Sequence, residues 1–167
     1  MHTLYLLSVW VHILAATAWV GGMFFLVLVV VPWLRAGARD RAGVFLRETG
    51  ERFRFVGWIC FGLLFLTGSF NLWIRGVRFE NFVDTSWLNS TYGRTVLTKL
   101  ALFSAILIVS TIHDFYVGPK AVQQIESNAN SAQASNLRRQ ASLLGRLNAL
   151  LALIMVAVAV VLVRGCP

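Results

Sequence analysis

Four apolar runs, each long enough to cross a bilayer, constrain the fold of this chain more than any motif does. They cover about residues 4–34, 53–75, 94–118 and 140–163. A hydrocarbon core about 30 Å thick requires about 20 apolar residues in a helix, and every run is longer than this. Because lipid offers no partners to backbone polar groups, such runs cross as helices. The sequence therefore predicts an all-α integral membrane protein with one four-helix domain over residues 1–167.

The composition supports this class and argues against others. Hydrophobic residues make up 57% of the chain and charged residues 13%, too little polar surface for a soluble domain of this size. The net charge of +8 lies in the connections, which indicates membrane topology and not nucleic-acid binding. Cys60 and Cys166 provide neither a disulfide framework nor a CxxC motif. Catalytic motifs such as a Ser-His-Asp set are absent, and the sequence leaves open whether the protein is an enzyme.

Lys and Arg residues are distributed unevenly between the two sides of the predicted bundle. The side of the first and third connections carries Arg35, Arg39, Arg41, Arg47, Arg52, Arg54, Lys120, Arg138, Arg139 and Arg146. The opposite side carries only Arg75, Arg78, Arg94, Lys99 and Arg164. The positive-inside rule then places the first and third connections in the cytoplasm and both termini outside. Since the connections are short, we expect an up-down-up-down bundle.

Polar side chains within the runs are the candidate functional residues, because such groups are costly at membrane depth and usually face the bundle interior. With about 1.5 Å of rise per residue, His12, Asn71 and Lys99 each lie roughly 9–10 Å outside the middle of their runs. Thr67 lies one turn deeper than Asn71 on the same face. Three helices thus contribute to an outer polar cluster, and Arg94 stands at the mouth of the third run.

A second polar group, His113, Asp114 and Asn148, lies nearer the cytoplasm. His113 follows Lys99 by fourteen residues, almost four turns, so we expect both side chains to face inward. His12 and His113 are offset by roughly 18 Å along the membrane normal, so the two histidines cannot ligate one metal ion. Two separate sites remain, or two sets of structural hydrogen bonds.

The candidate metal ligands are few. They are His12 and His113, with Met23 on the same face of the first helix as His12, and imidazole and thioether groups both suit copper. His2 and Cys166 share the outer side and form a further candidate soft-metal site with Met1.

Each of these residues also has a purely structural interpretation. Lys99 can extend its ammonium group to the outer interface, and His12 and His113 can be hydrogen-bonded residues of the core. Cys60 is expected to be a packing residue.

The segment STYGRTVLTKLALF (90–103) resembles the Y-G-R…K signature of the copper resistance D (CopD) membrane family. VHILAATAWVGGMFFLVLVVVP (11–32) resembles its H…W-x-G-G helix, and the segments 52–73 and 144–165 resemble its second and last helices. The resemblance implies a copper-handling, copper-transport or copper-resistance protein of the bacterial cytoplasmic membrane. The matching positions are His12, Trp19, Gly21, Gly22, Tyr92, Gly93, Arg94 and Lys99.

The chain is also similar to the HemJ family, four-helix membrane haem proteins linked to protoporphyrinogen oxidation. That similarity implies haem b for electron transfer or for porphyrin or quinol oxidation, with a histidine on the iron and basic groups on the propionates. The residues that would hold the cofactor are His12, His113, Lys99, Arg94 and Asn71. A third interpretation is an accessory subunit that packs in the lipid bilayer against a larger membrane complex or against further copies of itself.

Overall fold

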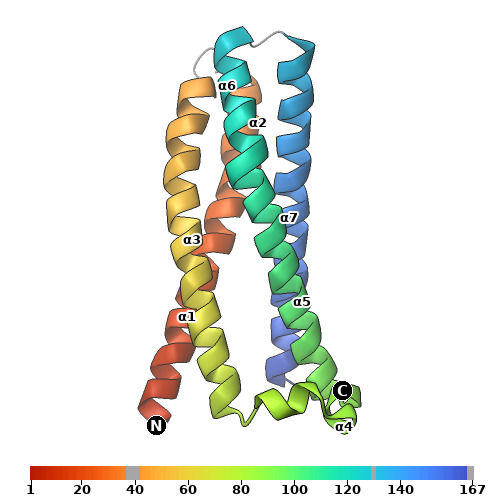
Figure 1. Cartoon of the computed structure of the whole chain (residues 1–167). Coiled ribbons are helices and arrows are strands. Elements are labelled where there is room, and N and C mark those ends of the chain that lie inside the picture. Colours follow the sequence, from red (N-terminus) through yellow and green to blue (C-terminus); the bar gives the residue numbers. More distant parts are fainter. Residues whose placement is uncertain (37–41, 129–130, 165–167) are drawn as a thin grey trace.

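Four long helices run side by side in the computed structural model and form one elongated bundle (Figure 1). The structure describes residues 1–36, 42–128 and 131–164. Four helical segments are long and apolar enough to cross a membrane, namely His2–Trp33, Arg47–Ile74, Thr91–Ser127 and Ala132–Arg164. The predicted all-α class and the four spans are therefore confirmed. The last three helices are longer than predicted, because each continues into the polar sequence that flanks its apolar run.

Two of the four spans contain a short π-helical turn within otherwise regular α-helix. In chain order the elements are α1 (His2–Phe25), η1 (Leu26–Val30), α2 (Val31–Ala36), α3 (Ala42–Ile74), η3 (Phe79–Phe82), α4 (Thr85–Asn89), α5 (Thr91–Ile112), η4 (His113–Val117), α6 (Gly118–Asn128) and α7 (Ala132–Arg164). The turns η1 and η4 are π-helical, whereas η3 is a 3₁₀-helix. The short helix α4 lies across one end of the bundle, where α1 begins and α7 ends (Figure 1). We call this end the terminal end and the other the opposite end.

The connection between α3 and α5 is defined by local backbone chemistry. After α3, Gly76 adopts a φ of 85°, and the amide of Val77 donates to the carbonyl of Leu72 over 3.1 Å. This is the left-handed glycine cap that commonly terminates helices. At the start of α5 the hydroxyl of Ser90 accepts a hydrogen bond of 3.0 Å from the amide of Gly93, which satisfies one free donor of the first turn.

The bundle is built from two antiparallel helix pairs, α1 with α3 and α5 with α7. Small residues let the first pair approach closely. A Cβ added to Gly57 would lie 3.5 Å from the Trp19 ring, and one added to Gly22 would overlap the ring of Phe53. The glycines of the WVGG segment therefore serve packing at Gly22, whereas Gly21 has nothing within 4 Å of an added Cβ.

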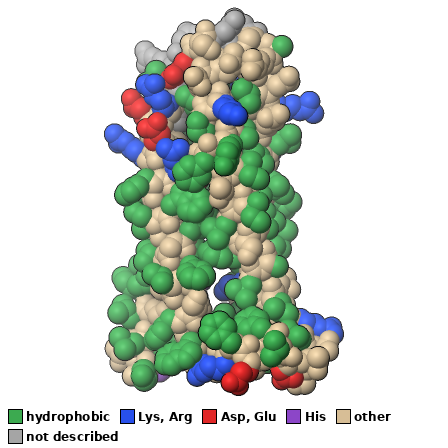
Figure 2. Space-filling view, in the orientation of Figure 1, with side chains coloured by type: hydrophobic (Ala, Val, Ile, Leu, Met, Phe, Trp, Pro, Cys, Tyr) green, Lys and Arg blue, Asp and Glu red, His purple; other side chains and the backbone are tan. Residues whose placement is uncertain are grey.

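An apolar core joins all four long helices, and the aromatic rings around Phe61 come from three of them. The ring of Phe61 lies 4.9 Å from that of Trp19, 5.5 Å from that of Trp58 and 6.2 Å from that of Phe103. The core residues are Ala15, Trp19, Met23, Cys60, Phe61, Ile106, Ala149 and Ala152. The packing role predicted for Cys60 is therefore confirmed. Apolar side chains also cover the outside of the middle of the bundle, while charged side chains gather toward its ends (Figure 2), as expected for a lipid-facing surface.

Replacing Gly93 by alanine tests the close contact at the start of α5. A Cβ at Gly93 would fall far inside the contact distance of the Trp87 carbonyl oxygen, so backbone would have to move. We expect Gly93→Ala to lower the free energy of unfolding by about 3 kcal/mol, measured by denaturant unfolding in detergent micelles.

The matched control is Gly145→Ala in α7, where an added Cβ has nothing within 4 Å. That variant should be neutral or up to about 1 kcal/mol more stable, because alanine is the better helix former. Equal stability of the two variants would contradict the contact at Gly93.

Candidate functional site

Polar side chains from three helices meet near the terminal end of the bundle. We call this group the His12 cluster, and its members are His12, Thr67, Asn71, Arg75 and Lys99. His12 comes from α1 and Lys99 from α5, whereas Thr67 and Asn71 lie on one face of α3, and Arg75 follows directly after the last residue of α3 at the same interval of four residues. The phase of α3 thus presents a polar stripe to α1 and α5.

The ring of His12 is held in one orientation by Thr67. His12 Nδ1 lies 2.7 Å from Thr67 Oγ1, and that hydroxyl also lies 2.5 Å from the backbone carbonyl of Leu63, to which it donates. Because a hydroxyl has only one proton, Nδ1 must be the donor to Thr67, and in the neutral imidazole Nε2 is therefore the nitrogen without a proton. Nε2 then keeps its lone pair and is available to a ligand. The lack of a side chain at Gly68 makes room for the ring, since an added Cβ would lie 3.4 Å from His12 Cε1.

One cation, Lys99, lies near this histidine, and a second, Arg75, lies near Lys99. Lys99 is half-buried and close enough to both His12 and Arg75 to act on them electrostatically. Arg75 Nε donates a hydrogen bond of 3.2 Å to the Tyr5 hydroxyl, and this bond raises the pKa of the guanidinium against a smaller opposing effect of partial burial. Within the described part of the chain, neither Lys99 nor Arg75 forms an ion pair with an acidic side chain. Figure 2 shows a basic side chain inside a hollow between the helices toward the terminal end.

Two buried polar atoms near this cluster have no hydrogen-bond partner. They are Asn71 Oδ1 and the hydroxyl of Tyr92. The Tyr92 hydroxyl lies near the Arg75 guanidinium and favours its charged form, but it does not meet the geometry of a hydrogen bond. A buried polar atom without a partner costs free energy, which makes these two oxygens candidates for contact with a ligand.

A second polar group lies closer to the opposite end. We call it the Asp114 cluster, and its members are His113 and Asp114. The carboxylate of Asp114 accepts hydrogen bonds from Trp58 Nε1 over 3.2 Å and from His113 Nδ1 over 3.0 Å. Its backbone carbonyl accepts a bond of 3.0 Å from Arg54. These contacts connect α3 to the π-helical turn η4, and π-helical turns are frequent at functional sites. The structural interpretation of His113 thus has a defined partner in Asp114.

One further contact links α5 to α7 at this depth. Asn148 Nδ2 donates to the hydroxyl of Ser110 over 2.9 Å, and Ser110 is only 3% exposed. Asn148 Oδ1 is buried without a partner.

The two clusters lie at different depths. Thr67, the partner of His12, and Trp58, which contacts the Asp114 cluster, are nine residues apart on the continuous helix α3. At about 1.5 Å per residue this is a separation of roughly 13 Å, and Phe61 of the apolar core lies between them. The geometry therefore keeps His12 and His113 apart, in agreement with the separation inferred from the sequence.

Several predicted site residues do not reach the His12 cluster. Met23 is 6% exposed in the apolar core and lies eleven residues along the continuous helix α1 from His12, roughly 16 Å away. His2 is exposed in the first turn of α1, and Cys166 lies outside the described residues. Arg94 is exposed, donates to Asn89 Oδ1 over 3.3 Å and lines a groove between α5 and α7. No group of three or more His, Cys, Asp or Glu side chains suited to a metal ion occurs in residues 1–36, 42–128 and 131–164.

Arg75 and Tyr5 were not predicted as site residues, and Tyr92 was identified only as a position that matches the family motif. A signal for Arg75 was present, because it follows Asn71 by four residues and Thr67 by eight and so shares their helix face. Only the packing of α1, α3 and α5 brings the hydroxyls of Tyr5 and Tyr92 to Arg75.

The fold and the two clusters define a multi-pass membrane protein with polar groups inside its helix bundle. A family model described as "Copper resistance protein D" matches residues 47–162, and the chain belongs to this family. The match includes Lys99, His113 and Asp114 but begins after α1, so it does not include His12. A protein of Aquifex aeolicus (strain VF5), named only "Uncharacterized protein", is 32% identical over 151 residues, which cover 90% of this chain and 89% of that protein. No solved structure matches the chain. The similarity to the HemJ family stays a prediction.

Replacing Trp58 by phenylalanine tests whether the Asp114 cluster stabilises the bundle. The variant removes the N–H group that donates to Asp114 and keeps most of the aromatic packing. A hydrogen bond to a charged group contributes about 2 kcal/mol, so Trp58→Phe should lower the free energy of unfolding in micelles by about that amount.

Trp10→Phe is the control, since Trp10 is 59% exposed and has no hydrogen bond among the described residues. Its stability should stay within about 0.5 kcal/mol of the parent protein. A Trp58 variant that behaves like the Trp10 variant would show that the contact with Asp114 is energetically neutral.

Proposed function

We propose that the protein handles copper at the His12 cluster, with the copper ion as cargo. The observation that carries the proposal is the hydrogen bond between His12 Nδ1 and Thr67. This bond leaves the lone pair of Nε2 free to bind a metal ion near the terminal end. Imidazole nitrogen is a good ligand for copper, and a hydrogen bond to the second ring nitrogen orients such ligands in metalloproteins. Membership of the copper resistance protein D family supports copper over other metals.

Further donors are available in the same region. Asn71 Oδ1 is buried and unpartnered and lies one turn from Thr67 on the same face of α3, so it can add an oxygen donor near His12, whereas the unpartnered Tyr92 hydroxyl lies near Arg75. Met23 is excluded from this site by its distance along α1. We therefore propose a site of nitrogen and oxygen donors, open toward the terminal end.

The charges of the cluster favour transient binding over storage. Lys99 and Arg75 repel a nearby metal cation and lower its occupancy unless an anion accompanies it. Among the described residues, the apolar core around Phe61 lies between this site and the Asp114 cluster. We propose that copper is taken up or released at the terminal end, which the predicted topology places outside, and that passage across the membrane requires the core to rearrange.

Haem b is the second candidate, and the two unpaired cations favour it. Lys99 and Arg75 would bind carboxylate groups such as haem propionates, and His12 Nε2 would ligate the iron. The cofactor would supply redox chemistry when bound. A haem group would have little room toward the middle of the bundle, because Trp19 and Phe61 fill the space next to the His12 cluster there. An accessory role, in which the clusters are purely structural, is the third candidate.

Removing the His12 ring or its hydrogen-bond partner tests the proposed site. We expect His12→Ala to abolish copper binding by the purified protein, and Thr67→Val to weaken it about 10- to 100-fold, the usual effect of losing the group that orients a ligand. Thr67→Ser keeps the hydroxyl and should bind like the parent protein. Metal analysis and copper titration give these values.

Copper binding that survives His12→Ala would contradict the proposed site. An absorption spectrum of the same samples separates the candidates, because a Soret band that is lost in His12→Ala identifies haem. Protein that retains neither copper nor haem, and that purifies with further subunits, would favour the accessory role.

Neutralising Lys99 distinguishes copper from haem by the direction of the effect. Lys99→Gln removes a positive charge beside the site, so copper should bind roughly tenfold more tightly, a typical effect of one charge in a partly buried site. Haem content should instead fall, since a partner of the propionates is lost. Lys120→Gln at the opposite end is the control and should change neither. Unchanged copper affinity in Lys99→Gln would place Lys99 outside the site.

A further inference from the structure

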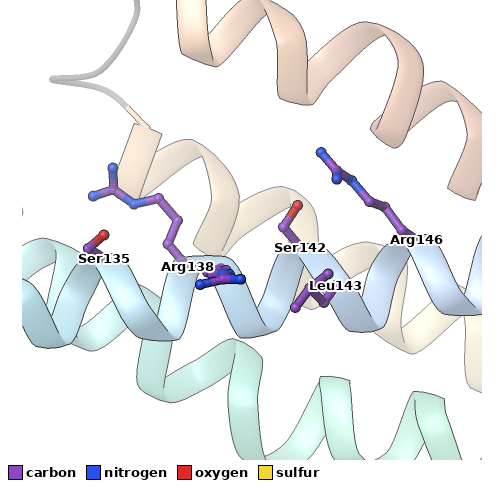
Figure 3. A pocket seen from close by; sticks show the side chains of 6 residues that line it. Ser135, Arg138, Ser142, Leu143 and Arg146 are labelled. Atoms are coloured by element: carbon purple, nitrogen blue, oxygen red, sulfur yellow. The ribbon is translucent and has the colours of Figure 1, made fainter.

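A basic pocket lies on α7 at the opposite end of the bundle, remote from the His12 cluster. It has a volume of about 430 Å³ and is lined by Ser135, Arg138, Arg139, Ser142, Leu143 and Arg146. Figure 3 shows that the side chains of Arg138, Ser142 and Arg146 extend from the same side of the helix. The spacing of four residues between Arg138, Ser142 and Arg146 explains this common direction.

The lining carries three arginines and no acidic side chain. Other arginines near this end have partners in the protein. Arg47 forms an ion pair of 3.2 Å with Glu126, and Arg54 donates to the backbone carbonyl of Asp114. Arg139 and Arg146, in contrast, are exposed and form no ion pair with an acidic side chain in the described part of the chain. Arginine groups together with serine hydroxyls are suited to bind phosphate oxygens.

An apolar stripe continues from the pocket along α7 toward the middle of the bundle. Leu143 in the pocket is followed by Leu147, Leu150 and Ile154 at intervals of three and four residues, which places all four on one helix face. They are 52%, 44%, 55% and 41% exposed, so the protein leaves this face uncovered. Arg146 stands where the long apolar part of α7 begins. Phosphate-binding groups therefore sit directly at the end of a surface suited to hydrocarbon.

We propose that this pocket is a binding site for an anionic phospholipid. The phosphate of the head group contacts Arg139 and Arg146, and the acyl chains lie along Leu147, Leu150 and Ile154. A soluble phosphate compound would use the basic groups but not the apolar stripe. A second copy of the chain docked on the same face would bring two arginine clusters together, which like-charge repulsion disfavours. Basic pockets near the membrane surface of other membrane proteins bind the anionic head groups of lipids through Lys and Arg side chains.

The test uses the full-length protein purified in mild detergent and compares two double variants. Arg139→Gln/Arg146→Gln removes two charges from the pocket. Arg94→Gln/Arg164→Gln removes two exposed charges at the terminal end and is the matched control. Thermal unfolding is followed during titration with phosphatidylglycerol, with phosphatidylcholine and with inorganic phosphate, and circular dichroism checks that each variant is folded.

We expect phosphatidylglycerol to raise the melting temperature of the parent protein and of the control variant well above the effect of phosphatidylcholine. The pocket variant should require roughly 30-fold more phosphatidylglycerol, since each basic side chain near an anionic surface contributes a factor of about five. Where that variant does not fold, Arg146→Gln alone should require roughly fivefold more.

Three results would overturn the proposal. They are an equal response of the pocket and control variants to phosphatidylglycerol, an equal effect of phosphatidylcholine on the parent protein, and a full effect of inorganic phosphate alone. The last result would assign the pocket to a soluble anion. None of these results bears on copper binding at His12, which lies at the other end of the molecule.

Discussion

The packing of Phe61 against Trp19, Trp58 and Phe103 is the interaction on which the rest of the structure depends. It joins α1, α3 and α5 within the membrane-spanning part and fills the interior between the helix pairs. Because side chains occupy this level, the polar groups of the bundle are divided between the His12 cluster and the Asp114 cluster. The interior therefore holds two polar clusters with aromatic rings between them, and we propose that an ion passes from one to the other only when these rings move.

The side chains of His12 and Asp114 differ in how fully their own polar atoms are satisfied, although Asn148 Oδ1 at the depth of Asp114 is also buried without a partner. In the Asp114 cluster the carboxylate has partners on two sides, and the contacts with Trp58 and Arg54 fasten η4 to α3. In the His12 cluster only the Nδ1 side of the histidine has a partner, and Asn71 Oδ1 is buried without one. Satisfied networks stabilise a fold, whereas unsatisfied groups at membrane depth indicate binding. This contrast is why the proposed function is placed at His12 and not at His113.

Much of the fold and part of the site could be predicted from the sequence. The lengths of the apolar runs were sufficient to predict the four helices. The number of residues from the middle of each run was sufficient to predict that His12, Asn71 and Lys99 lie near the same end. Helix phase explains the failures: Arg94 precedes Lys99 by five residues and so faces away from it, whereas Arg75 shares the face of Asn71. Met23 shares a helix face with His12 but not a depth. The absence of partners for Asn71 Oδ1 and the hydrogen bond of His12 Nδ1 depend on how α1 packs against α3, which no local pattern in the sequence reveals.

X-ray absorption spectroscopy of the copper-loaded protein tests the central claim most directly, because it reports the atoms bound to the metal. The account predicts an imidazole nitrogen among the ligands of the parent protein and of His113→Ala, and its loss in His12→Ala. Sulfur ligation in the parent protein, or an imidazole signal that disappears only in His113→Ala, would contradict the account.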